Sequence, residues 1–147
     1  MPAHNILREA SDMNLAEYFD KMKGMGVMAT ADSTGNVNVA AISKPMLMDD
    51  ETVAFVMAGH LTYRNLQSNP QAAYLFKEKD SYGGKRLYMT KIREEEGGDL
   101  METVRKKRYP IFTTKYVNES KYVVVFHLDR VLPLVADGVL KPGVKEE

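Results

Sequence analysis

The sequence contains no cysteine, and that absence excludes a disulfide, a thiolate-ligated metal site and a cysteine nucleophile. It also has no excess charge of either sign, because twenty Lys and Arg residues balance twenty Asp and Glu residues. A nucleic-acid-binding protein normally needs a clustered excess of basic residues to meet the phosphates. We therefore expect no nucleic-acid partner.

Long apolar runs are absent as well. No stretch approaches the roughly 20 apolar residues that cross a bilayer, and the first four residues lack the basic and apolar segments of a secretory leader. We expect a cytoplasmic protein without membrane contact. The sequence has no GxGxxG, no Walker-type loop, no GxSxG and no paired histidines, so we predict no bound metal and the catalytic residues stay unknown.

The 147 residues are enough for one domain with one sizeable core. Within residues 10–24 the sequence predicts an N-terminal helix, because apolar residues recur at i, i+3, i+4 and i+7 from Leu15 to Met22. Asn14 can cap this helix, with Glu17 as the reciprocal partner. Gly24 and Gly26 end it. At the other end, residues 141–147 are expected to form a tail.

Six strands are predicted from alternating or β-branched apolar runs bounded by turn residues. Asp32-Ser33-Thr34-Gly35 supplies the turn of a hairpin between the first two. The six runs lie at residues 27–31, 37–44, 52–58, 72–76, 85–93 and 121–128, the last continuing into 131–135.

Two further short helices are expected, at residues 61–68 and about 100–108, the second opened by Asp99 with Glu102 as a capping pair. Strands and helices do not alternate regularly, which argues against a doubly wound parallel sheet. The sequence predicts an α+β fold, a six-stranded antiparallel split β-barrel with short flanking helices.

Several polar side chains lie close together in the loop after the third predicted strand, where His60, Thr62 and Arg64 stand at the start of a helix. A helix N-terminus presents unpaired N–H groups and a partial positive charge, so a phosphate could be held there. Thr62 has a second interpretation as an N-cap, with Asn65 at the third helical position. Ser43 and Lys44, at the end of the second strand, add another hydroxyl and another cation.

The stretch from Val27 to Phe76 resembles the flavin-binding half of the pyridoxamine 5'-phosphate oxidase-like family, the FMN-binding split barrels. The order of elements matches, and the short helix ends in the pattern N-L-x-x-N-P, here Asn65-Leu66-Gln67-Ser68-Asn69-Pro70. Weaker likeness continues through residues 84–89 and 131–134.

The resemblance implies that the flavin ring lies along the second and third strands near a dimer interface, with its phosphate held after the third strand. Carried over by position, the ring residues are Ala40, Ala41, Ile42 and Ser43, with Val56, Met57 and Ala58 close by. The phosphate residues are Thr62 and Asn65, with His60, Arg64 or Lys44 to complete the shell.

Two departures from the family are visible. Many members place Arg or Lys where this chain has Leu61 and Thr62, so the neutralising charge must come from Lys44, Arg64 or a second subunit. The C-terminal histidine with which true pyridoxamine-phosphate oxidases grip their substrate is replaced by residues 138–143, Gly-Val-Leu-Lys-Pro-Gly. We therefore predict that the protein is not a vitamin B6 oxidase.

These observations favour an FMN-dependent oxidoreductase of unknown substrate and electron donor. The alternative is a non-catalytic protein that binds flavin, or haem, or carries electrons. In either case Tyr88, Tyr109 and Tyr116 could stack on a ring, although tyrosines more often pack in cores and interfaces. A homodimer is expected, because the strand face of Val123, Val125 and His127 needs a cover.

Overall fold

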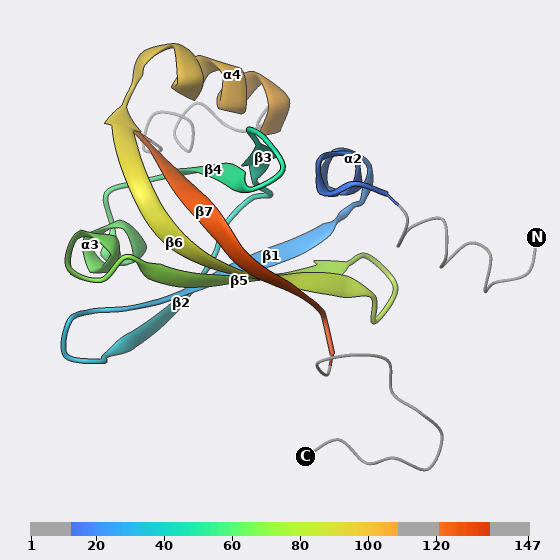
Figure 1. Ribbon diagram of the computed structural model, residues 1–147, viewed down its shortest axis with the longest axis horizontal. Helices are drawn as coiled ribbons and strands as arrows, with labels where there is room; N and C mark the ends of the chain where they lie inside the picture. The colour runs from blue at the N-terminus through green and yellow to red at the C-terminus, as the bar shows by residue number, and fades with distance from the viewer. Residues whose placement is uncertain (1–12, 109–120, 136–147) are drawn as a thin grey trace, which may run out of the picture.

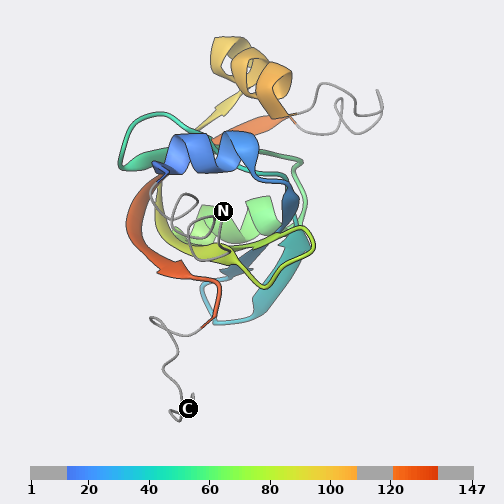
Figure 2. The same cartoon turned by 90° about the vertical axis from the view of Figure 1, so that its right-hand side faces the viewer.

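The computed structural model describes residues 13–108 and 121–135, which form one antiparallel sheet with three helices around it (Figure 1). The strands are hydrogen-bonded in the order β2-β1-β5-β6-β7-β4-β3. Their bounds are β1 Gly24–Ala31, β2 Val37–Ala41, β3 Met46–Leu47, β4 Thr52–Met57, β5 Gln71–Glu78, β6 Gly84–Glu96 and β7 Tyr122–Pro133. Figure 2 shows the sheet curving around its own interior.

The sheet has seven strands among the described residues, where six are predicted from the sequence. The additional strand is β3, which pairs only Met46 and Leu47 with β4. The predicted second strand, residues 37–44, is shorter than expected and ends at Ala41. Two residues are too few to show an alternation, so the sequence pattern could not reveal β3.

The helices are α2 Leu15–Lys21, α3 Leu61–Ser68 and α4 Gly98–Arg108. Asn14 caps α2 as predicted, since its side chain accepts from the Glu17 N–H at 2.8 Å. The predicted helix within 10–24 is longer than α2, because β1 already begins at Gly24 and residues 10–12 lie outside the described part. Asp99 lies in the first turn of α4 and not before it.

The first hairpin is closed by Asp32, whose carboxylate accepts hydrogen bonds from the backbone N–H groups of Thr34 and Asn36 and from both of their side chains. Gly35 has φ 90°, a conformation that costs glycine little. The predicted turn at residues 32–35 is confirmed, and β1 and β2 pair antiparallel across it.

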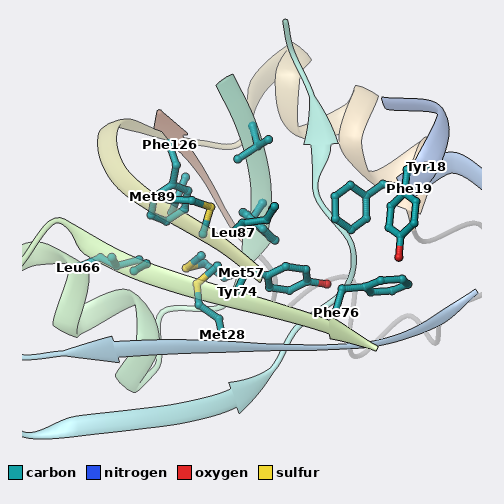
Figure 3. Packing of buried hydrophobic residues seen from close by; sticks show 14 residues of the cluster. Tyr18, Phe19, Met28, Met57, Leu66, Tyr74, Phe76, Leu87, Met89 and Phe126 are labelled. Atoms are coloured by element: carbon teal, nitrogen blue, oxygen red, sulfur yellow. The ribbon is translucent and has the colours of Figure 1, made fainter. Parts of the chain in front are cut away.

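The main core fills the inside of the curved sheet (Figure 3). Tyr18 and Phe19 of α2 enter it at one end, and Leu66 of α3 enters at the other. Between them pack Met28, Met57, Tyr74, Phe76, Leu87, Met89 and Phe126, all at most 5% exposed. The Tyr18 hydroxyl donates to Glu78 at 2.5 Å, which fixes α2 against β5. The two helices therefore close the interior from opposite ends.

A second, smaller core lies outside the sheet under α4. Met101 and Val104 of α4 pack there with Ala54 and Val56 of β4 and with Val123 and Val125 of β7. Val123 and Val125 are at most 1% exposed, so the expectation that they need a second subunit as cover is wrong. The chain covers them with its own helix, and of the three residues Val123, Val125 and His127 only His127 is exposed.

Candidate functional site

The start of α3 lies directly after the end of β4, as the sequence predicts. The N-cap position is His60, whose side chain makes no capping hydrogen bond, and the helix begins at Leu61. His60 and Arg64 are both exposed at this turn, and the Arg64 N–H donates to the His60 carbonyl at 2.9 Å. The His60 side chain therefore does not satisfy the first helical N–H groups in the way an N-cap side chain does.

Thr62 is the second residue of α3, so its interpretation as the N-cap is wrong. Its hydroxyl oxygen accepts from the Asn38 amide of β2 at 3.2 Å. A hydroxyl both accepts and donates, so the hydrogen of this O–H can still point to a ligand. This contact joins the start of α3 to the strand that the resemblance places beside the flavin ring.

The side chain of Asn65 is buried, whereas a phosphate ligand is expected to be accessible. It is 5% exposed, and its amide donates at 3.1 Å to the hydroxyl of Thr30, which is 4% exposed. A buried amide that is hydrogen-bonded to a buried hydroxyl anchors one element to another. Asn65 thus holds α3 onto β1.

A third set of hydrogen bonds, after those of Thr62 and Asn65, connects α3 to β6. The Tyr63 hydroxyl donates to the Glu94 carboxylate, which also accepts from Lys91 at 2.5 Å, and Lys91 in turn donates to the Leu66 carbonyl at 3.3 Å. Burial and the nearby Glu94 charge raise the pKa of Tyr63 well above its usual value. Burial acts to raise the pKa of Glu94, but hydrogen bonds led by that from Lys91 outweigh it and lower this pKa.

Tyr63 also stacks on Tyr122 of β7, with ring centroids 4.0 Å apart and planes 16° from parallel. The Tyr122 ring lies so close to Gly59 that a Cβ there would come within 3.0 Å of it. The loop at Gly59 and His60 is therefore backed by an aromatic pair. Neither Glu94 nor Tyr122 could be linked to α3 from the sequence, because they lie 31 and 59 positions from Tyr63 and no local pattern joins them.

The end of β2 is also held in place by the interior. The Ile42 N–H donates to the Gly26 carbonyl at 3.1 Å, and the Ile42 carbonyl accepts from the Tyr74 hydroxyl at 3.4 Å. A Cβ on Gly26 would lie 1.8 Å from that hydroxyl, so glycine is required where the ring crosses β1. Lys44 donates to the Met22 carbonyl at 2.9 Å. Its ammonium is therefore directed to the end of α2.

The remaining predicted ring residues divide between surface and core. Ala41 is exposed, and Ala40, Ser43 and Ala58 are half-buried. Val56 is 2% exposed under α4, and Met57 is 5% exposed in the main core. The Val56 side chain is thus part of the core under α4, and the Met57 side chain is part of the main core. A ligand could therefore contact β4 only at its backbone or at the loop that follows the strand.

A shallow trough, which the sequence did not reveal, lies on the outer side of β2, β1, β5 and β6. It holds about 350 Å³, and its lining is largely apolar: Val27, Ala29, Val39, Ala73, Tyr74, Leu75, Arg86 and Tyr88. Arg86 donates to the Pro133 carbonyl at 2.8 Å and to the Tyr88 hydroxyl at 3.3 Å. The Arg130 guanidinium lies 4.5 Å from the Tyr88 ring centroid. Tyr109 and Tyr116 lie outside the described residues.

Within residues 13–108 and 121–135, no group of three His, Asp or Glu side chains could hold a metal ion. The described part of the chain also has no helix that is long and apolar enough to span a membrane.

The curved antiparallel sheet, closed at its ends by α2 and α3, defines the split-barrel class of protein. No family model matches the chain, and no curated protein matches it significantly. Solved structures do. An FMN-binding protein from Syntrophomonas wolfei subsp. wolfei has 22% sequence identity and a TM-score of 0.71, over 94% of this chain and 93% of that one.

Two further structures have the same fold. An F420 reductase has 17% identity and a TM-score of 0.63, over 81% of this chain and 97% of its own. A protein from Lactobacillus delbrueckii, described as a candidate pyridoxamine 5'-phosphate oxidase, has 19% identity and a TM-score of 0.60, over 82% and 96%. These likenesses confirm the predicted split-barrel fold.

Proposed function

We propose that this protein binds flavin mononucleotide and works as a flavin-dependent oxidoreductase. The observation that carries the proposal is the first turn of α3, which has no side-chain cap and lies beside β2 in a fold shared with an FMN-binding protein. The donors present there suit a phosphate: backbone N–H groups, the Thr62 hydroxyl, and the exposed His60 and Arg64 side chains.

In this proposal each group has a defined task. Thr62 and Arg64 hold the phosphate, with His60 beside them. The segment from Ala40 to Ser43 borders the ring, where small side chains let a flat ring approach the backbone. Asn65 and Tyr63 keep α3 in place, and Lys44 stabilises the segment after β2 through Met22. When bound, the flavin itself supplies the redox chemistry, and the protein supplies position and surroundings.

The proposal also includes a cytoplasmic homodimer with the flavin near the interface. It does not include pyridoxamine-phosphate oxidase activity. The basis for that exclusion, residues 138–143, lies outside the described residues and stays a sequence-based prediction. The substrate and the electron donor are to be found by screening.

The direct test is the visible absorption spectrum of protein purified without added cofactor, followed by heat release and mass identification of the released compound. We expect a flavin spectrum and release of FMN. A Soret band would favour the haem-binding alternative, and a colourless protein that does not take up added FMN would contradict the proposal. If FMN is bound but neither NADH nor NADPH nor any screened substrate reduces it, the electron-carrier alternative is favoured.

The phosphate assignment has its own test. Arg64→Ala and Thr62→Ala should each weaken FMN binding and leave riboflavin binding unchanged, because riboflavin has no phosphate. Removing one charge-assisted hydrogen bond costs about 1.5–3 kcal/mol, or roughly 10-fold or more in affinity. Lys77→Ala, at an exposed lysine of β5, is the control. Unchanged FMN affinity in both variants would remove the assignment.

A further inference from the structure

The helix α3 carries the proposed phosphate site at its first turn, yet its own sequence supplies few of the groups that stabilise a helix. The first turn has no acidic residue, the last turn has no basic residue, and the His60 side chain makes no capping hydrogen bond. Acidic residues near the start of a helix and basic residues near its end interact favourably with the helix dipole. The position of α3 therefore depends on groups from the strands around it.

Side chains of α3 form hydrogen bonds with three strands of the described part of the chain. The Asn38 amide of β2 donates to Thr62, and Asn65 donates to the Thr30 hydroxyl of β1. These two contacts join neutral groups. The contact with β6 ends on the Glu94 carboxylate. A hydrogen bond to a charged group is roughly twice as strong as one between neutral groups, so the contact with β6 is expected to hold α3 most firmly.

The Glu94 carboxylate connects both ends of α3 to β6. Tyr63, in the first turn, donates its hydroxyl hydrogen to Glu94. Glu94 also accepts from Lys91 at 2.5 Å, and Lys91 donates to the Leu66 carbonyl, in the last turn, at 3.3 Å. Lys91 thereby places a cation near the carboxyl end of α3, where the helix has no basic residue of its own. We term Tyr63, Glu94, Lys91 and the Leu66 carbonyl the Glu94 network.

The Glu94 network is partly shielded from water. The side chains of Lys91 and Glu94 are 15% and 25% exposed. The neighbouring ion pair of Arg93 and Glu95 has side chains that are 47% and 39% exposed. Water screens the more exposed pair more strongly. Two adjacent carboxylates on one strand therefore differ in their surroundings, and only the first of them contacts α3 among the described residues.

We infer that Glu94 is a positioning residue for the phosphate site, which holds the first turn of α3 in place and thereby favours FMN over riboflavin. The inference rests on the proposed function, in which Thr62 and Arg64 hold the phosphate. Tyr63 lies between these two residues in the chain, so a hydrogen bond that fixes Tyr63 also limits the movement of both neighbours. A carboxylate is only an acceptor and repels a phosphate, so Glu94 acts through Tyr63 and not by direct contact.

The substitution Glu94→Gln tests the inference by the sign of its effect. In a titration followed by flavin fluorescence, the variant should bind FMN about 5-fold more weakly than wild type, at the low end of couplings between sites. Its affinity for riboflavin should be unchanged. Removal of a negative charge near the phosphate would by itself strengthen FMN binding. Glu95→Gln, the same chemical change in the more exposed ion pair, is the matched control and should bind both compounds as wild type does.

A double-mutant cycle tests the path through Tyr63. Tyr63→Phe removes the hydroxyl and keeps the ring that stacks on Tyr122. It should weaken FMN binding by about the same factor as Glu94→Gln, and the double variant should bind FMN no more weakly than either single variant, because both remove the same hydrogen bond. Losses that multiply, to about 25-fold in the double variant, would show that the two residues act independently and would overturn this path.

Hydrogen exchange of the cofactor-free protein separates this inference from the flavin proposal. The backbone amides of α3 should exchange faster in Glu94→Gln than in wild type or Glu95→Gln. Equal exchange in all three proteins would overturn the inference. Unchanged or tighter FMN binding by Glu94→Gln, or an equal loss of affinity for FMN and riboflavin, would overturn it as well. Faster exchange in α3 together with a wild type that takes up no FMN would support the role of Glu94 in positioning α3 and contradict the flavin proposal.

Discussion

The two halves of the outer sheet surface differ in what covers them. Over β4 and β7, Val123 and Val125 are fully buried under α4. Over β2 and β1, Val37 and Val39 are mostly exposed. Both halves have β-branched residues facing outward, so strand composition does not distinguish them. The difference arises because α4 turns back onto only one half (Figure 1). The uncovered half is therefore where a partner is to be sought.

The largest predicted effect concerns the covered half. Met101→Ala should lower the free energy of unfolding by about 3 kcal/mol, because it leaves a cavity under α4. Val37→Ala, in the exposed half over β2 and β1, should change it by less than about 0.5 kcal/mol. Denaturant unfolding at one fixed protein concentration measures both, since the stability of the proposed dimer would depend on concentration. Equal losses in the two halves would break the comparison.

A medium effect is expected where α3 is tied to β6, beside the exposed half. Glu94→Gln removes the charge that accepts from Tyr63 and Lys91, and should cost about 1 kcal/mol in a partly exposed setting. The control is Glu95→Gln, whose ion pair with Arg93 is exposed and should contribute little.

The pH dependence gives the sign of the Glu94 contribution. The folded state lowers the pKa of Glu94, so its stabilisation is present above the ordinary carboxyl range and is lost as the pH falls through the folded value. The melting-temperature difference between wild type and Glu94→Gln should therefore shrink in acid. A difference that grows in acid would contradict the stabilisation assigned to the hydrogen bonds that Glu94 accepts from Tyr63 and Lys91.

The smallest effect is expected at the hairpin of the exposed half. Hydrogen bonds from Asn36 and Thr34 lower the pKa of Asp32 to about 2. The turn should lose this stabilisation as the pH falls from the unfolded carboxyl value of about 4 to about 2. We expect Asp32→Ala to melt slightly lower than wild type at neutral pH and to match it near pH 2. A gap that persists at pH 2 would show that Asp32 acts other than through its charge.

The sequence predicted the parts of the fold that have local signals. The alternating run in β4, the turn at Asp32 and the Asn14 cap each lie within a few residues of their partners, and all are confirmed. The burial of Val123 could not be predicted, because it depends on where α4, which lies between β6 and β7 in the chain, docks on the sheet. The hydrogen bond from Asn65 could not be predicted either, because its partner Thr30 lies 35 positions away. The sequence suggested that Asn65 is a phosphate ligand, whereas in the structure its side chain attaches α3 to β1.

The most direct test of the central claim is a titration of the cofactor-free protein with FMN and, separately, with riboflavin, followed by quenching of flavin fluorescence. If the first turn of α3 holds the phosphate, FMN should bind at least about 10-fold more tightly than riboflavin, a difference of about 1.4 kcal/mol. Equal affinity for the two compounds, or no binding of either, would contradict the account.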